Sequence, residues 1–200
     1  MESKGIISPE TLDTLGQYGS ILSGHPTIEV PGIEVNTGAL GHGLSIGVGM
    51  ALAAKMNHQS YKTYVLMGDG EQGEGSIYEA AMAAHQYKLD NLVAIIDRNR
   101  LQISGTTEEV MAIEDIYQRW TALGWDVKHM NGDDIEDIVH CFSEIDFESK
   151  RPHLLISHTT KGKGVSYMEN VTKWHHGVPN QEEFDLAIKE ISERIATLEK

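Results

Sequence analysis

The sequence predicts an α/β protein with a doubly wound, mainly parallel sheet, and three observations support this class. Short apolar runs with strand character recur along the chain, and amphipathic helical patterns follow them. Glycine-rich polar loops follow two of these runs, which is typical of ligand loops at the carboxyl ends of parallel strands. The alternation implies right-handed βαβ crossovers. The expected strands are 63–67, 92–97, 125–130 and 153–158, and the helices after them are 75–87, 113–123, 134–145 and 182–198.

The first 43 residues are expected to be mostly irregular. Ser8 is placed as a helix N-cap and Pro9 as the first helical residue, so a short helix is predicted to run to about Gln17. Glycine and proline then punctuate the chain up to about Gly43, a pattern typical of a binding loop. Residues 1–43 are therefore expected to form an irregular binding-loop region.

Residues 44–180 are expected to form the βα core. A run rich in small residues at 44–57 contains Gly47 and Gly49, and glycine inside a helix indicates close packing. The run Lys161-Gly-Lys-Gly164 lacks the full spacing of a phosphate loop and favours a turn. The segment 181–200 is expected to be a C-terminal helix that packs on the domain, and exposure of this helix to a partner is the alternative. Its apolar residues near helical spacing are Phe184, Leu186, Ile188, Ile191 and Ile195.

Composition narrows the class of protein. Two hundred residues with 40% hydrophobic content suffice for one α/β domain, so we expect residues 1–200 to form a single domain. The formal charge of −14 argues against nucleic acid and anionic membranes as partners. No apolar run of membrane-spanning length and no basic leader occur, so a cytoplasmic location is expected. Cys141, the single cysteine, is expected to be a buried small hydrophobe on a helix.

Polar residues at the ends of two predicted strands indicate a magnesium diphosphate site. Asp69 lies between Gly68 and Gly70, and 28 residues (71–98) separate Gly70 from Asn99. Adjacent parallel strands would bring Asp69 and Asn99 to one edge of the sheet. Mg²⁺ prefers oxygen ligands and takes one or two carboxylates beside phosphate oxygens. Asp69, Asn99 and the main-chain carbonyl of Leu101 are the predicted protein ligands, and the two glycines let the backbone approach the phosphate.

A dinucleotide site is the competing interpretation. Gly68, Gly70 and Gly73 also match G-x-G-x-x-G after a strand, which alone is a weak signal. The dinucleotide version expects an acidic residue about 20 positions further on, whereas the next strand ends at Asp97, nearer 30. The carboxylate of Asp69 would repel a bare pyrophosphate but would bind a bridging Mg²⁺. Charge and spacing therefore favour the metal site.

Seven motifs in the same order resemble those of transketolase, and most closely those of the N-terminal subunit of split transketolases. In these, the diphosphate-binding and pyrimidine-binding domains are separate polypeptides. The resemblance covers essentially the whole chain. The runs that carry it are Gly24-His-Pro26, Pro31-Gly-Ile-Glu-Val-Asn-Thr-Gly38, Gly68-Asp-Gly-Glu71, Glu74-Gly75, Glu79-Ala-Ala81, Asp97-Arg-Asn99 and Lys161-Gly-Lys-Gly164.

The resemblance implies a thiamine diphosphate-binding fold and a thiamine diphosphate- and Mg²⁺-dependent enzyme. Such an enzyme transfers a two-carbon ketol unit between sugar phosphates. By this resemblance Asp69, Asn99 and the Leu101 carbonyl hold Mg²⁺, and Gly70 contacts the diphosphate. Other thiamine enzymes, such as deoxyxylulose phosphate synthases and ketoacid dehydrogenases, remain alternatives, although the runs at 31–38 and 161–164 favour transketolase.

The resemblance also implies roles for residues outside the metal loop. Gly38 matches a glycine whose backbone meets the aminopyrimidine, and Leu40 matches a residue against the thiazolium. Glu74 matches a glutamate in the network that couples two active sites across an interface. His25 matches a histidine that bonds donor hydroxyls.

A second substrate histidine is expected late in the chain. The run Trp174-His-His-Gly177 offers His175 and His176, with His175 preferred and His176 as the alternative. Gapless alignment with split subunits favours His175, whereas the histidine-glycine pair favours His176.

The resemblance also implies what this chain lacks. Family members usually begin some seventy-odd residues earlier, in a segment with two further histidines, so the chain is expected to be N-terminally truncated relative to the family. The glutamate that activates the aminopyrimidine belongs to the pyrimidine domain. We therefore expect activity only with a C-terminal pyrimidine-domain subunit, in a heterotetramer; a noncatalytic binding or assembly protein is the alternative.

Overall fold

The structure is a computed structural model that describes residues 1–198. The chain divides into two compact units, residues 1–40 and the remainder from Gly41. This boundary lies three residues before the expected end of the binding-loop region at 43. The expectation of one thiamine diphosphate-binding domain stays a prediction. Residues 199 and 200 of the expected C-terminal helix lie outside the described residues.

The first unit contains little regular structure, as expected. It has a 3-10 helix, η1 (Glu2–Lys4), and a one-turn helix, α1 (Pro9–Leu12). The predicted helix to Gln17 is wrong in length. The hydroxyl of Thr14 donates to the carbonyl of Thr11 at 2.7 Å, and Gly16 has a left-handed φ of 73°. The bond from the Thr14 side chain competes with the main-chain hydrogen bonds of a helix. The left-handed backbone at Gly16 is not helical either, so the helix does not reach Gln17.

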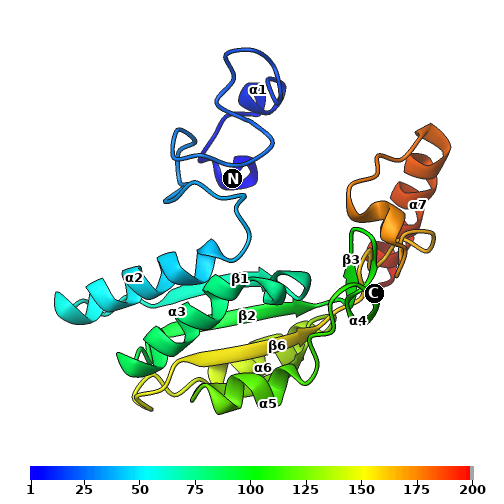
Figure 1. The fold of residues 1–200 in the computed structure, drawn as a ribbon. Helices are drawn as coiled ribbons and strands as arrows, with labels where there is room; N and C mark the ends of the chain where they lie inside the picture. Colours follow the sequence, from blue (N-terminus) through cyan, green and yellow to red (C-terminus); the bar gives the residue numbers. More distant parts are fainter. Residues whose placement is uncertain (199–200) are drawn as a thin grey trace. The chain divides into compact units, whose positions relative to one another are not determined.

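A four-stranded parallel sheet organises the second unit and confirms the predicted fold class (Figure 1). The strand order is β1-β2-β6-β5, and every neighbouring pair is parallel. Each predicted strand agrees with an observed one within one residue. The strands are β1 (Thr63–Gly68), β2 (Leu92–Arg98), β5 (Asp126–Asn131) and β6 (His153–His158).

Helices cover both faces of this sheet, so the sheet is doubly wound (Figure 1). One face packs against α2 (His42–Met56), α3 (Gly75–Gln86) and α5 (Ile116–Ala122) through the larger apolar core. The other face packs against α6 (Ile135–Ser143) through a smaller core. The larger core includes Trp120 and Trp125 in edge-to-face contact, with ring centroids 4.7 Å apart. The smaller core includes Cys141, which is buried on α6 as predicted.

Glycine in α2 permits the close approach that the sequence indicated. A Cβ at Gly47 would collide with a methyl group of Val65 on β1, whereas a Cβ at Gly49 would meet nothing within 4 Å. The inference of close packing therefore holds at Gly47 and not at Gly49. The backbone of α2 lies on the β1 end of the sheet because residue 47 has no side chain.

The remaining elements are short, apart from the last helix. A small antiparallel hairpin, β3 (Leu101–Gln102) and β4 (Gly105–Thr106), was not predicted, because two-residue strands leave no periodic signal. It is followed by α4 (Thr107–Val110), which begins with a capping box between Thr106 and Glu109. The 3-10 helices are η2 (Gly70–Gly73) and η3 (Thr172–His175).

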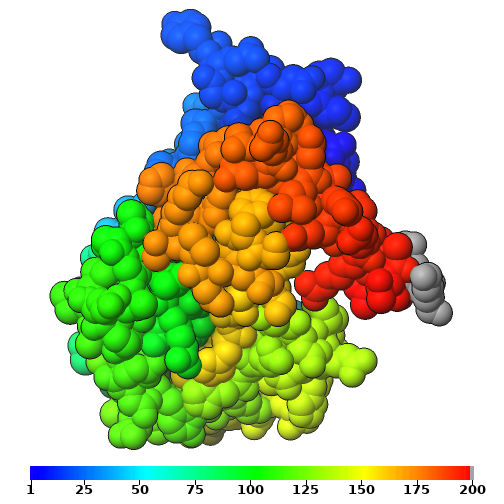
Figure 2. Space-filling model, turned by 90° about the vertical axis from the view of Figure 1, so that its right-hand side faces the viewer, coloured from blue at the N-terminus to red at the C-terminus, as the bar shows by residue number. Residues whose placement is uncertain are grey.

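The final helix, α7 (Gln181–Leu198), matches the predicted range within one residue (Figure 2, red). Its apolar residues do not pack on the domain, which favours the alternative of an exposed helix. Ala187 is its buried residue, and the five apolar side chains named from the sequence are 41 to 51% exposed. Within residues 1–198, no helix combines the length and apolar character that a membrane span requires.

Candidate functional site

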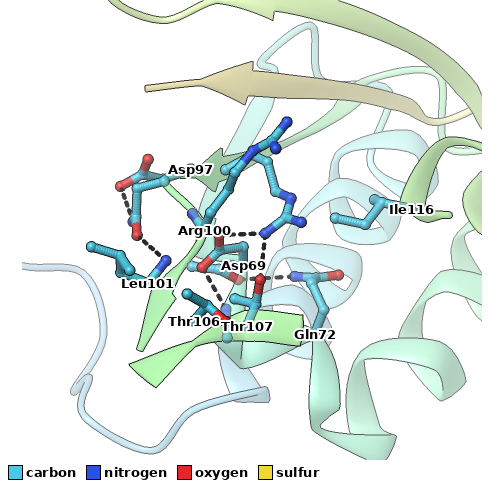
Figure 3. Close-up of polar contacts among 12 residues, drawn as sticks. Asp69, Gln72, Asp97, Arg100, Leu101, Thr106, Thr107 and Ile116 are labelled. Carbon is cyan, nitrogen blue, oxygen red and sulfur yellow. Dashed lines mark hydrogen bonds and ion pairs between the residues drawn. The ribbon is translucent and has the colours of Figure 1, made fainter. Parts of the chain in front are cut away.

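The residues predicted to bind the metal follow β1 and β2 at the carboxyl ends of these strands, and Figure 3 labels Asp69 and Leu101 among them. These strands are parallel neighbours, with Gly68 opposite Asp97. The main-chain N–H of Asp69 donates to the carbonyl of Asp97 at 3.2 Å, so the two loops leave the sheet side by side. Asp69 and Asn99 are thereby brought to one edge.

The carboxylate of Asp69 is buried and strongly held. Its residue is 1% exposed. One oxygen, Oδ1, accepts from the Gly70 N–H at 2.7 Å. The other, Oδ2, accepts from the Arg100 N–H at 2.6 Å and from Nη1 of Arg98 at 3.0 Å (Figure 3). The second loop therefore positions the carboxylate of the first.

Arg98 is the principal site residue that the sequence reasoning missed. It lies at the end of β2, is 3% exposed, and its side chain also donates to Thr107, Glu108 and Glu114. Burial acts to lower the pKa of the guanidinium, but the hydrogen bonds to Glu114 and Asp69 outweigh this and raise it. The hydrogen bond from Arg98 likewise lowers the pKa of Glu114. Arg98 is therefore a permanent cation beside Asp69.

A signal for Arg98 was present in the strand. Arg98 is in phase with Leu92, Ala94 and Ile96, which all lie on the buried face of β2 that packs against the larger core. A buried arginine requires carboxylate partners. Period-two alternation therefore indicated an ion pair here.

Asn99 is oriented by its own loop. Its Oδ1 accepts from the Leu101 N–H at 3.0 Å, and its Nδ2 donates to Asp97 at 3.2 Å. Asp97 is itself held by the hydroxyl of Thr159, which follows β6. These bonds point the amide oxygen of Asn99 away from Asp97 and leave that oxygen a second lone pair.

Gly70 lies against Gln102 with no room for a side chain. A Cβ at residue 70 would come within 2.9 Å of Cγ of Gln102. The Nε2 of Gln102 is buried and makes no hydrogen bond to any described residue. Glu71 closes the same loop from the other side, accepting from Gly68 N–H at 3.0 Å and from Gly41 N–H at 2.7 Å.

The predicted donors are of the chemical kind that Mg²⁺ takes, and their role as ligands stays a prediction. Oδ1 of Asp69 and Oδ1 of Asn99 each accept one hydrogen bond from the described residues and so retain a lone pair, and both are the hard oxygen donors that Mg²⁺ takes. No group of three or more His, Cys, Asp or Glu side chains arranged for a metal occurs in residues 1–198. One carboxylate, one amide and one carbonyl would need diphosphate oxygens to complete the coordination shell.

The late histidines lie on a segment that reaches this site. The 3-10 helix η3, which ends at His175, contacts β3, the strand that contains Leu101. His175 and His176 are both exposed, and their ring centroids are 6.0 Å apart. Partial burial and the nearby Lys161 and His176 lower the pKa of His175. A neutral imidazole at residue 175 is therefore favoured at neutral pH.

In the first unit, the structure brings His25 and Gly38 together. Gly38 has a φ of 123°, and a Cβ there would lie 2.9 Å from Cγ of His25. The Ile28 N–H donates to Oδ1 of Asn36 at 2.9 Å, which closes the loop between them. His25 therefore rests on the bare backbone of residue 38. Leu40, two residues further, is 60% exposed.

Glu74 begins α3 as its N-cap and is exposed. Its side chain lies against Gly41, where a Cβ would approach the Glu74 Cβ to 2.7 Å. The Glu74 side chain therefore lies next to the start of α2. No contact between Glu74 and Asn99 occurs among the described residues.

Comparisons with known proteins identify the family of the chain. Residues 7–193 match the family model "Transketolase, thiamine diphosphate binding domain". The chain is 75% identical, over its full length and 71% of the relative, to one subunit of the apulose-4-phosphate transketolase of Phocaeicola vulgatus. It is 38% identical, over 94% of the chain and 69% of the relative, to the SqwG subunit of a 6-deoxy-6-sulfo-D-fructose transketolase from a Clostridium species.

A solved structure agrees with the fold. The transketolase from Campylobacter jejuni matches with a TM-score of 0.85 at 35% identity, over 92% of this chain. This chain covers 30% of that one, so it corresponds to a part of a complete transketolase. The chain belongs to the transketolase family, as a thiamine diphosphate-binding domain whose relatives include separate subunits.

Proposed function

We propose that this chain is the diphosphate-binding subunit of a split, Mg²⁺-dependent transketolase, which transfers a two-carbon ketol unit between sugar phosphates. The observation that carries the proposal is the buried Asp69 carboxylate, which lies beside the Asn99 loop at the carboxyl edge of a parallel strand pair. This is where open α/β sheets bind ligands. The family match supports thiamine diphosphate as the ligand.

Each residue of this edge has a proposed task. Asp69, Asn99 and the Leu101 carbonyl would hold the cation, and Gly70 would let the backbone approach the diphosphate. The side chain of Gln102 lies against Gly70, and its Nε2 is a buried donor without a partner among the described residues. Thiamine diphosphate, when bound, would supply a carbon acid that serves as a nucleophile after it loses its proton, and a ring that accepts negative charge.

The other predicted residues would handle the cofactor ring and the substrate. We propose that Gly38 and Leu40 meet the ring system and that His25 donates a hydrogen bond to the donor sugar. His175 or His176 would supply a second such bond, and the contact of η3 with β3 supports a place near the cation. Glu74 would join the network between two active sites.

Activity is proposed to need a C-terminal pyrimidine-domain subunit, in a heterotetramer with two copies of each chain. Relatives that are named as single subunits of a transketolase support the need for a second chain. The cofactor would lie between the chains, so its affinity for this chain alone should be poor.

The names of the relatives suggest which donor sugar the enzyme uses. Two of the relatives are named for apulose 4-phosphate and for 6-deoxy-6-sulfo-D-fructose. The 75% identity to the first makes apulose 4-phosphate our first candidate donor. Xylulose 5-phosphate is the comparison donor.

The test is to reconstitute the chain with its pyrimidine-domain partner and to measure ketol transfer from each donor to ribose 5-phosphate. Asp69→Ala should abolish Mg²⁺-dependent thiamine diphosphate binding in the complex, measured by calorimetry, because it removes the carboxylate ligand. His25→Ala should chiefly raise KM for the donor. Asp13→Ala, an exposed position in the first unit, serves as the control.

Two results would contradict the proposal. Unchanged cofactor binding in Asp69→Ala would exclude that residue as a ligand. A pair that binds thiamine diphosphate but transfers no ketol unit from any of these donors would favour the noncatalytic alternative.

A further inference from the structure

The two candidate substrate histidines depend on their neighbours in the chain for their position. They lie in the histidine segment, residues 172–177, where η3 ends at His175 and is followed by His176. The two imidazole rings contact each other, with centroids 6.0 Å apart, and no hydrogen bond from residues 1–198 reaches either ring. A ring that binds a substrate in one orientation must be held there by other groups.

Trp174, next to His175, anchors the segment by three contacts. Its Nε1 donates to the main-chain carbonyl of Tyr167 at 3.0 Å. The rings of Trp174 and Tyr167 lie edge to face, with centroids 5.2 Å apart. The ammonium group of Lys173 lies 4.4 Å from the centre of the indole ring. Trp174 is half-buried, whereas both histidines are exposed, so the indole is the side chain that fixes this segment.

Gly177 lets the chain fold back over the indole. A Cβ at residue 177 would lie 2.8 Å from the carbonyl oxygen of Lys173 and 3.2 Å from Cε3 of Trp174. The first distance is shorter than real Cβ contacts, so a side chain here would push the two ends of the segment apart. The two histidines lie between these ends. The indole and Gly177 together therefore fix the main chain that carries the imidazoles.

The carbonyl that accepts from the indole belongs to a closed loop, residues 161–170. The loop begins with the run Lys161-Gly-Lys-Gly164, which forms a turn as expected from the sequence. Its two glycines have left-handed φ values of 78° and 96°, which glycine adopts without strain. The Asn170 N–H donates to the Lys161 carbonyl at 2.9 Å and closes the loop. Tyr167 is thereby held in the middle of a fixed loop.

The same loop is tied to the candidate metal site. Thr159 and Thr160 join it to the end of β6. The hydroxyl of Thr159 donates to Asp97, and Asp97 accepts from the side-chain amide of Asn99 at 3.2 Å. Through this loop, Trp174 holds the histidine segment relative to the predicted ligand Asn99.

We propose that Trp174 is a positioning residue for the substrate histidine, and that it acts through the bond from its indole N–H to the Tyr167 carbonyl. The inference rests on the proposed function and adds the contact that holds the histidine segment near the cation site. It also gives the run at 161–164 a task, which is to support this carbonyl. Trp174 acts through the imidazole of His175 or His176 and not on the sugar itself.

The test compares two changes that loosen the segment with one that does not. Trp174→Phe keeps an aromatic ring beside Tyr167 but removes the indole donor. Gly177→Ala adds the Cβ that collides with the main chain of the segment. The control is Ser166→Ala, which removes a bond from the loop to Glu190 on α7, 2.5 Å long, and leaves Trp174 unchanged. Each variant is measured in the complex with the pyrimidine-domain subunit, after circular dichroism has checked its fold.

We expect Trp174→Phe to raise KM for the donor sugar about two- to tenfold, the range that the loss of one hydrogen bond corresponds to. The kcat value should change less than about twofold, because the histidine bonds the donor in the ground state and in the transition state alike. Gly177→Ala should act in the same direction, and Ser166→Ala should leave KM unchanged. The Kd of thiamine diphosphate should stay the same in all three variants.

Titration of the imidazoles by NMR provides a readout that does not need activity. Burial and the nearby Lys161 lower the pKa of His175. Trp174→Phe should raise this pKa towards its ordinary value, because a loosened segment exposes the ring and moves it away from Lys161. Ser166→Ala should leave the pKa unchanged.

The outcomes separate this inference from the proposed function. If the wild-type complex transfers the ketol unit and Trp174→Phe has the donor KM of the wild type, the inference is wrong and the function stands. A rise in KM with an equal loss of thiamine diphosphate affinity would also overturn it, because Trp174 would then support the whole site. If the wild-type complex is inactive, the function is wrong and the titration decides the inference. A pKa of His175 that rises in Trp174→Phe alone supports it, and equal pKa values in the wild type and both variants overturn it.

Discussion

Replacing Arg98 by methionine removes the cation that is paired with the buried Asp69 carboxylate while keeping a side chain of similar length. The Arg98 and Asp69 side chains are each 2% exposed, whereas those of Glu108 and Glu114, the other ion-pair partners, are 45 and 49% exposed. Breaking the ion pair with Asp69 should therefore cost more free energy of folding than breaking either of the other two. In the variant, Asp69 would keep the Gly70 N–H and the Arg100 N–H as donors to its carboxylate.

The expected loss follows from this burial. Removing one partner of a buried ion pair costs about 3 to 5 kcal/mol, because an uncompensated charge is left inside. For a chain of this size that corresponds to a fall in Tm of about 6 to 20 °C. The free energy of unfolding is measured by urea titration followed by circular dichroism, and Tm by calorimetry. Arg100→Asn is the control, because residue 100 is exposed, its main-chain N–H is retained, and asparagine tolerates its φ of 68°.

Magnesium provides a second measurement on the same variant. If Asp69 is a cation ligand, Mg²⁺ should raise the Tm of Arg98→Met by more than that of the wild type, because a bound cation then replaces the missing positive charge. A difference in Tm of about 3 °C corresponds to about 1 kcal/mol in the free energy of unfolding. A Tm for Arg98→Met within this difference of both the wild type and the control would refute the claim that the buried ion pair is costly to break.

Two further predictions concern packing and titration. Gly47→Ala should be less stable than Gly49→Ala by about 1 to 3 kcal/mol in urea titrations, because only the first Cβ collides with Val65; equal stabilities would mean that α2 does not lie this close to β1. Lys161→Gln should raise the pKa of His175, which the ammonium group of Lys161 helps to lower, so the imidazole should take up its proton at a higher pH. Titration of the His175 ring by NMR checks this, and an unchanged or lower pKa would contradict the placement of the two side chains.

Much of the fold was accessible from the sequence because the signals were local. Apolar runs and helical periodicity located the four strands and the main helices within a few residues. Gly68, Gly70 and the polar residues after the strands located the candidate metal loop for the same reason. Such patterns depend only on near neighbours in the chain.

The differences between the sequence predictions and the structure arise from contacts that the local pattern does not contain. The helix predicted to Gln17 begins at Pro9 as expected but ends at Leu12, and the residues after it include Thr14, whose hydroxyl bonds the Thr11 carbonyl, and the left-handed Gly16. The α7 side chains look like a core-facing set in the sequence, and the structure shows that Glu183 and Glu190 make the attachments instead. Periodicity says which residues share a side of a helix, but not what lies opposite that side.

By itself the sequence determined the class of fold, the family resemblance and the pair Asp69 and Asn99 as candidate ligands. Only the tertiary structure decided which strands are neighbours, that Arg98 compensates the charge of Asp69, and that η3 contacts β3 although the two are far apart in the chain. The physical reason is that the pairing of a buried charge and the exposure of the apolar side chains of α7 depend on groups distant in sequence. Their positions are set by how the sheet and helices pack, which no local pattern records.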